Sequence, residues 1–128
     1  MLYSEIGLAA HVGGGRIHDQ LARAQAALPS AFIGVTRGAD GFYWYEAGNV
    51  RHAQSVDVHV VDTFGAGTVF RGAYALALAE HMAADASAQF ACVAASLKCS
   101  VLGGRLGAPD RETMQRALRL LNTELEAA

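Results

Sequence analysis

The residues best suited to chemistry form one short segment, Asp62-Thr63-Phe64-Gly65-Ala66-Gly67-Thr68. A strand-like run ends at its aspartate, and a helix-like pattern begins at its last residue. Glycines let the backbone approach a ligand closely, and the free N–H groups at a helix N-terminus attract an anion. The segment therefore predicts a site for a phosphate, or for the charge that builds on a phosphoryl group during its transfer.

The spacing of this segment excludes two common phosphate-binding motifs. Walker A requires a lysine directly before Ser or Thr, and Gly67 precedes Thr68 here. The dinucleotide fingerprint requires a third glycine, and Phe70 stands at that position. One alternative stays open at this point: the glycines serve the sterics of a tight strand–helix turn, and Thr68 is an ordinary helix cap.

Hydrophobic periodicity predicts alternating helices and strands around the segment. The first half gives a helix over 16–28, a buried strand over 31–36, a turn over 37–41 and a hairpin of strands 42–45 and 50–53. The second half gives a strand over 56–61 and helices over 68–82, 86–98 and 110–125. We expect Asp110 to cap the last of these helices, and the core stripe of helix 86–98 to be Phe90, Val93, Ala94 and Leu97. These elements predict one α/β domain, residues 1–128, whose sheet has fewer strands than the usual five or six.

Composition excludes several classes of protein. With 52% hydrophobic and 17% charged residues and a formal net charge of −2, the chain is neither disordered nor suited to a nucleic acid. Its longest apolar run, 73–79, is too short to span a bilayer, and its first residues do not resemble a signal peptide. The histidines and cysteines show no zinc-type spacing. We expect a cytoplasmic protein with no membrane partner.

The segment 62–67 resembles the Asp-Thr-x-Gly-Ala-Gly-Asp signature of the pfkB carbohydrate kinase (ribokinase-like) family. Residues 71–74 resemble those that follow this signature, and 35–41 resemble the family's Thr-x-Gly-x-x-Gly segment. Residues 94–99 with 103–109 are similar to its closing helix and loop. The matches run in order along the chain, yet they cover only the family's C-terminal part. The N-terminal part of full members carries most of the sheet, the lid and the sugar contacts.

The resemblance implies a partial ribokinase-like doubly wound sheet with helices on both faces and one β-hairpin. It implies ATP-dependent phosphoryl transfer to a sugar hydroxyl, with Mg²⁺ accompanying ATP. It assigns the anion hole to Gly65, Ala66 and Gly67, and the nucleotide lining to Thr36, Gly38 and Gly41. It also assigns a potassium-like cation to Asp62, together with carbonyl groups of Phe64 and the 98–107 loop.

Two departures from the family pattern indicate impaired catalysis. The signature's last aspartate is the family's general base, and Thr68 takes its place with a hydroxyl that has no accessible basic form near neutral pH. The family's metal-associated Asn-x-x-Glu element would fall at 4–7, where Ser4 and Gly7 stand and Glu5 is the nearest carboxylate.

We therefore predict a truncated, impaired sugar kinase domain that keeps nucleotide or anion binding. A sugar would bind only if the missing half were supplied. The alternative, from another class, is a non-catalytic interaction module. Such a module would form a homo-oligomer or pair with a partner through an exposed sheet edge.

Overall fold

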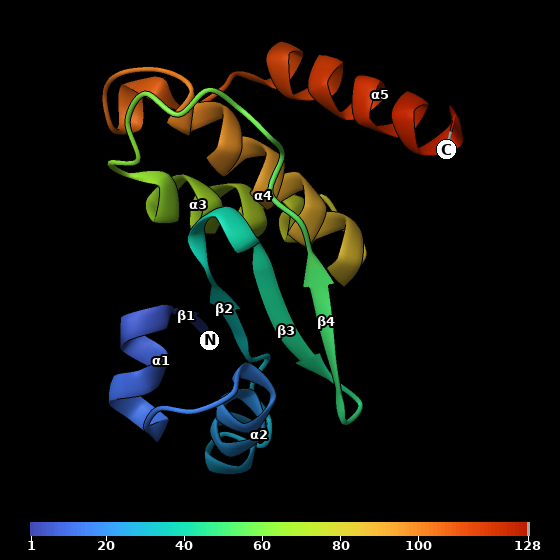
Figure 1. Cartoon of the computed structure of the whole chain (residues 1–128). Helices are drawn as coiled ribbons and strands as arrows, with labels where there is room; N and C mark the ends of the chain where they lie inside the picture. Colours follow the sequence, from blue (N-terminus) through green and yellow to red (C-terminus); the bar gives the residue numbers. More distant parts are fainter. Residues whose placement is uncertain (128) are drawn as a thin grey trace. The chain divides into compact units, whose positions relative to one another are not determined.

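The computed structural model describes residues 1–127 of the chain (Figure 1). The chain divides into two compact units, which meet between Ser55 and Val56 in the sequence. The first unit holds β1 (Leu2–Ser4), α1 (Glu5–Val12), α2 (Ile17–Ala27), β2 (Gly34–Thr36), η1 (Gly38–Asp40), β3 (Phe42–Glu46) and β4 (Asn49–Ala53). The second holds α3 (Ala66–Ala79), α4 (Ala84–Cys99), η2 (Arg105–Gly107) and α5 (Arg111–Ala127). Whether the two units make one domain stays a prediction.

The first unit is built on a four-stranded sheet in the order β1-β2-β3-β4. The β1–β2 pair is parallel and the other two pairs are antiparallel, so the predicted hairpin of β3 and β4 is confirmed. Val35 is in register with Tyr3 on one side and Tyr43 on the other, which places the three side chains on one face. That face packs with Leu8 of α1 and Leu21 of α2 in a single apolar core.

Helix α1 was not predicted from the sequence. Ser4 caps it, because its hydroxyl accepts a hydrogen bond from the Gly7 N–H at 3.1 Å. Leu8 is its one fully buried residue, and Ile6 is 84% exposed, so the helix carries almost no amphipathic pattern. A glycine in its first turns further weakens the helical propensity that a sequence pattern can detect.

The predicted strand over 56–61 is wrong, since β4 ends at Ala53 and the chain runs on without regular structure to the segment before α3. Its backbone donors bind helix α4 rather than a neighbouring strand. The Val56 N–H donates to the Ser96 hydroxyl at 3.1 Å, and the Val61 and Asp62 N–H groups both donate to the Cys99 carbonyl, at 2.8 and 3.1 Å.

The second unit is a helical hairpin of α3 and α4 with α5 packed against it, and α3 and α4 lie side by side (Figure 1). The predicted stripe of α4 is confirmed: Val93 and Ala94 are buried with Met114 of α5, and Phe90 and Leu97 pack against them. Asp110 caps α5, as predicted, by accepting the Thr113 N–H at 2.8 Å. Helices α3 and α4 each begin two residues before the predicted start. No described helix is both long and apolar enough to cross a membrane.

Candidate functional site

The turn before α3 has the geometry that its glycines predict. Gly65 is the N-cap of the helix in the left-handed region, with φ 81° and ψ 1°, a conformation that glycine adopts without steric cost. The Asp62 carboxylate opens the turn by accepting the Phe64 N–H at 2.9 Å. The Ala66 N–H then donates to the Thr63 carbonyl at 3.1 Å. The chain thus turns sharply and enters a helix of 14 residues.

The first turn of α3 leaves backbone donors free. Among the described residues, no acceptor is paired with the N–H groups of Gly65, Gly67 and Thr68. Because these donors lie at the positive end of the helix dipole, the position favours a bound anion. The anion hole was predicted at Gly65, Ala66 and Gly67; the Ala66 N–H is used within the turn, so its part stays a prediction.

A cavity of about 620 Å³ adjoins this turn within the second unit. It lies among one side of α3 as far as Leu76, helix α4, the loop before α5 and the start of α5. Its lining is mostly apolar: Phe64, Gly65, Thr68, Val69, Gly72, Ala73, Leu76, Phe90, Ala94, Gly104, Ala108, Pro109, Arg111 and Met114. Thr68, at the position of the family's base, therefore borders the cavity.

Arg111 is the one charged side chain of that lining, and it is already paired. Its guanidinium donates two hydrogen bonds to the Glu80 carboxylate, at 3.1 and 2.9 Å. The same hydrogen bonds, reinforced by the positive charge, hold the pKa of Glu80 below its ordinary value. The cavity thus offers apolar walls and one polar hydroxyl beside the free donors of α3.

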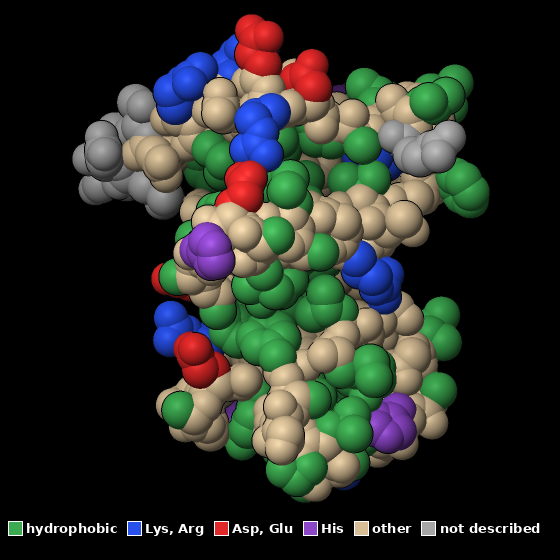
Figure 2. Space-filling view, turned by 180° about the vertical axis from the view of Figure 1, so that it is seen from behind, with side chains coloured by type: hydrophobic (Ala, Val, Ile, Leu, Met, Phe, Trp, Pro, Cys, Tyr) green, Lys and Arg blue, Asp and Glu red, His purple; other side chains and the backbone are tan. Residues whose placement is uncertain are grey.

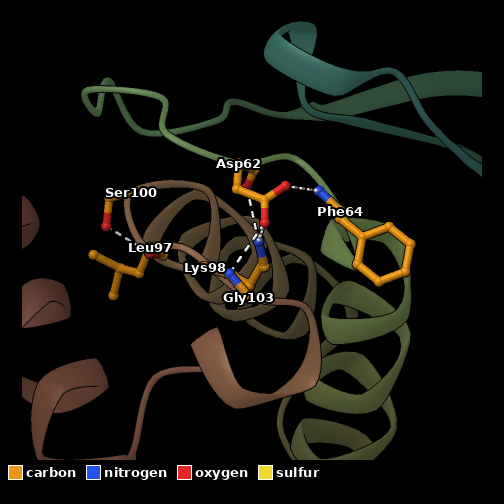
Figure 3. A network of polar contacts seen from close by, with 6 residues as sticks. All are labelled: Asp62, Phe64, Leu97, Lys98, Ser100 and Gly103. Carbon is orange, nitrogen blue, oxygen red and sulfur yellow. Dashed lines mark hydrogen bonds and ion pairs between the residues drawn. The ribbon is translucent and has the colours of Figure 1, made fainter.

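A polar network fixes the Asp62 carboxylate (Figure 3). One oxygen accepts the Phe64 N–H at 2.9 Å and the other accepts the Gly103 N–H at 3.1 Å. The Lys98 ammonium group donates to the Asp62 main-chain carbonyl at 2.7 Å and lies 3.7 Å from the carboxylate. The two backbone hydrogen bonds, followed by the Lys98 charge, lower the pKa of Asp62. The network joins the turn at 62–65 to the end of α4 and the loop after it.

The potassium-like cation predicted at Asp62 does not fit this arrangement. Both carboxylate oxygens already accept backbone N–H groups, and the Lys98 ammonium lies against the same residue. A second positive charge at about 4 Å from the ammonium would be repelled by about 4 kcal/mol at an effective dielectric constant of about 20. Among the described residues, no group of three His, Cys, Asp or Glu side chains could hold a metal ion.

The predicted nucleotide-lining residues Thr36, Gly38 and Gly41 lie together on the first unit, at the end of β2 and around η1. The Thr36 hydroxyl donates to the Tyr3 carbonyl at 3.4 Å, and the Gly41 N–H donates to the Gly38 carbonyl at 3.0 Å. Their role toward a nucleotide stays a prediction. The predicted metal-associated element at 4–7 starts α1, where the Ser4 hydroxyl is used as a helix cap.

The sequence analysis included Lys98 and Gly104 in the closing helix and loop but gave neither of them a role. Lys98 follows Ala91 and Ala94 at helical spacing, and both alanines are buried, so its place on the inner stripe of α4 was detectable. Gly104 gave no such signal. A Cβ atom there would come within 2.9 Å of the Phe64 ring, a contact between distant segments that spacing cannot reveal.

A comparison with known protein families identifies the family of this chain. The sequence pattern of the pfkB family carbohydrate kinases matches residues 4–111. The chain belongs to the pfkB family of carbohydrate kinases. The resemblance inferred from the segment 62–67 is thereby confirmed. Because the match starts at Ser4, it includes parts of both units.

Individual pfkB relatives show the same relation and its extent. The ribokinase of Lactococcus lactis is 31% identical over 91 residues, which cover 71% of this chain and 30% of that protein. The crystal structure of a protein assigned as a ribokinase from Agrobacterium tumefaciens is 40% identical with a TM-score of 0.89, covering 95% of this chain and 40% of that one. The structure of Arabidopsis thaliana ribokinase with ribose and ATP is 25% identical with a TM-score of 0.81, covering 90% and 39%.

These pfkB relatives confirm the predicted partial ribokinase-like α/β fold. They also agree with the low strand count of the sheet, because the chain spans 30–40% of the length of its relatives.

Proposed function

We propose that the chain is the nucleotide-binding part of a pfkB family sugar kinase and binds ATP with Mg²⁺. The observation that carries this proposal is the set of free N–H groups at the start of α3, beside the mostly apolar cavity. An ATP molecule has both matching parts: anionic phosphates for the helix end and a flat heteroaromatic base for apolar walls. Thr36, Gly38 and Gly41 are proposed as further nucleotide contacts.

In this function the described residues would act mainly by position and charge. The N–H groups of Gly65 and Gly67 would stabilise the charge that develops on the transferring phosphoryl group, which is the main catalytic task in phosphoryl transfer. Thr68 would border the same site without removing a proton from the sugar hydroxyl. We therefore propose a domain that binds ATP and transfers its phosphoryl group slowly, with the sugar site supplied by the missing half.

A calorimetric titration with ATP and Mg²⁺ tests whether the chain binds ATP. A variant that fills the cavity tests whether ATP binds in that cavity. Gly72 lines the cavity, and a Cβ atom there would meet nothing within 4 Å, so the Cβ atom of Gly72→Leu has room and the rest of its side chain would take up cavity space. We expect it to weaken ATP binding at least about tenfold, which is about 1.4 kcal/mol. Ala75→Leu is the matched control, because Ala75 is exposed on the same helix and lies outside the cavity lining. Equal affinity in both variants would place the nucleotide elsewhere.

The position of the base has its own test. When the chain is joined to the N-terminal part of a ribokinase relative, Thr68→Asp should raise the rate of phosphoryl transfer by about 10²–10⁴-fold, the usual range for general-base assistance. Thr68→Asn is the control, since it matches the size of the side chain without supplying a base. A rise with both variants would contradict the assignment.

A second function, a non-catalytic interaction module, is favoured by the apolar surface. Phe64, Leu102 and Leu106 of the second unit are 75%, 79% and 90% exposed. Hydrophobic side chains are also visible in many places on the surface that Figure 2 shows. In the first unit, no described strand lies beyond β1 or β4, so both edges can accept a further strand. Light scattering on a dilution series tests this proposal, and a clean monomer at every concentration would count against it.

A further inference from the structure

Lys98 is unusual both in the sequence and in the structure. It is the one lysine among the 128 residues, and the remaining Lys and Arg residues are all arginines. Its side chain is 0% exposed, in a helix whose inner stripe is otherwise apolar, serine or cysteine. Burying an ammonium group destabilises the fold unless the group is paired and hydrogen-bonded. The groups around Lys98 should therefore indicate its role.

The ammonium group is directed at Asp62 (Figure 3). It donates to the Asp62 carbonyl at 2.7 Å and lies 3.7 Å from the carboxylate. That residue is also the one that the family resemblance assigns to a monovalent cation. A potassium ion carries the same single positive charge as the ammonium group and binds the same kinds of ligand, a carboxylate and main-chain carbonyl oxygens.

The loop after α4 leaves space for the lysine stem. Gly107 is buried, and a Cβ atom there would lie 3.3 Å from the Lys98 Cε atom and 2.9 Å from a methyl carbon of Val101. Its missing side chain therefore lets the (CH₂)₄ stem pass to Asp62. Gly103, on the same loop, donates its N–H to the Asp62 carboxylate at 3.1 Å.

We propose that the Lys98 ammonium group is a built-in replacement for the monovalent cation, so that this site works without potassium. Lys98 is a positioning residue. It holds Asp62, and through Asp62 the turn at Phe64 and Gly65, against the loop at Gly103. The proposal concerns the cation requirement of the second unit and does not depend on ATP binding.

The test compares thermal unfolding of the native chain and Lys98→Met in KCl, NaCl and choline chloride at equal ionic strength. The native melting temperature should be the same in all three salts. Lys98→Met keeps the length of the stem and removes the charge, so it frees the Asp62 main-chain carbonyl for a free cation and removes the charge that would repel one beside the carboxylate. We expect its melting temperature to rise by about 5 °C between 0 and 200 mM KCl, and by less in NaCl, because a ligand that binds the folded state stabilises it. Choline, which is too large for the site, should have no effect.

Arg116→Met is the matched control. It removes a cationic side chain that is paired with Glu112 at 3.4 Å and is 60% exposed. It should show no preference for potassium, because surface pairs respond to ionic strength alone. A purely structural role of Lys98 would lower the stability of Lys98→Met equally in all salts, and that result would overturn the proposal. A potassium-selective rise in the native chain would overturn it as well.

A measurement on the native chain decides the question if Lys98→Met fails to fold. Labelling with ¹⁵N-lysine gives one side-chain ammonium resonance, because the chain has one lysine. A group that is hydrogen-bonded to Asp62 should give a sharp signal that is unchanged by 200 mM KCl. A signal lost to fast exchange with water, or one that shifts with KCl and not with choline chloride, would overturn the proposal. Absence of ATP binding would leave each of these results standing and would contradict the proposed function alone.

Discussion

The chain contains two glycine turns that follow apolar segments, at 36–41 in the first unit and at 62–68 in the second, and they use their glycines differently. In the first turn the backbone closes on itself, with the Arg37 N–H on the Gly41 carbonyl at 2.8 Å and the Gly41 N–H on the Gly38 carbonyl at 3.0 Å. The Ser55 hydroxyl adds a bond to the Gly38 carbonyl at 3.0 Å. In the second turn the N–H groups of Gly65, Gly67 and Thr68 have no acceptor among the described residues.

The space around the glycines separates the two turns further. A Cβ atom on Gly41 would come within 2.1 Å of the Ala53 carbonyl oxygen, so the fold itself requires glycine there. A Cβ atom on Gly67 would meet the Arg71 guanidinium, the mobile end of a long side chain, at 3.2 Å. The fold does not require Gly67, and a glycine within a helix usually lowers its stability relative to alanine. A glycine at this position, beside free donors, leaves room for the phosphate of the proposed ATP site.

The largest expected effect breaks the first turn. Gly41 has φ 92° and ψ −141°, a region that is nearly exclusive to glycine, and its backbone neighbour cannot move aside. Gly41→Ala should lower the free energy of unfolding by about 3 kcal/mol. Denaturation in urea, followed by Trp44 fluorescence, measures this loss in the unit that contains the turn.

Gly48→Ala is the control for steric crowding at Gly41. Gly48 also has a positive φ, 82°, but a Cβ atom there would meet nothing within 4 Å. Its cost should be about 1 kcal/mol, the value for a left-handed residue without a clash. Equal losses in the two variants would show that the contact with Ala53 is unimportant.

The sequence was informative where a pattern has a local cause. The α4 stripe, the Asp110 cap and the β3–β4 hairpin were all predicted, because each depends on residues a few positions apart. The motif at 62–67 also predicted a sharp turn into a helix, and Gly65 adopts the conformation that this turn needs.

The failures share a non-local cause. The alternation over 56–61 is typical of a strand, yet a strand needs a pairing partner, and these donors bind Ser96 and Cys99 of α4 instead. Lys98 falls within the helix predicted over 86–98, and its partner Asp62 lies 36 residues away. The identity of a long-range partner cannot be deduced from spacing within one segment.

A smaller effect should separate the two turns by their response to acid. The second turn is held by the Asp62 carboxylate, whose pKa the Phe64 and Gly103 N–H groups lower. Because the pKa is lowered in the folded state, the carboxylate stabilises the fold at pH values above its ordinary pKa of about 3.9. This contribution is lost as the pH falls through the pKa of the folded state. The amide proton shifts of Phe64 and Gly103 should therefore stay constant from about pH 7 to 5 and change below about pH 4.

The first turn supplies the control for this titration. The Arg37 N–H donates to a main-chain carbonyl, which does not titrate, so its shift should not follow that of Phe64. Asp62→Asn should remove the acid-dependent change at Phe64 and Gly103. A change that persists in this variant would assign the acid response to another group.

The smallest effect on stability sharpens the comparison most. Gly67→Ala replaces a glycine in the first turn of α3, where only the flexible end of Arg71 must shift, and should raise the free energy of unfolding by about 0.5–1 kcal/mol. The added methyl group covers the approach to the free N–H groups, so ATP binding should weaken about tenfold in the same protein. Gly65→Ala, by contrast, should lower both the free energy of unfolding and the affinity for ATP, because a φ of 81° strains any L side chain. Calorimetric titration and urea denaturation of the two variants check the pair. A Gly67→Ala protein that is more stable and binds ATP as tightly as the native chain would show that this glycine is free of any ligand, and the difference between the two turns would then be one of packing alone.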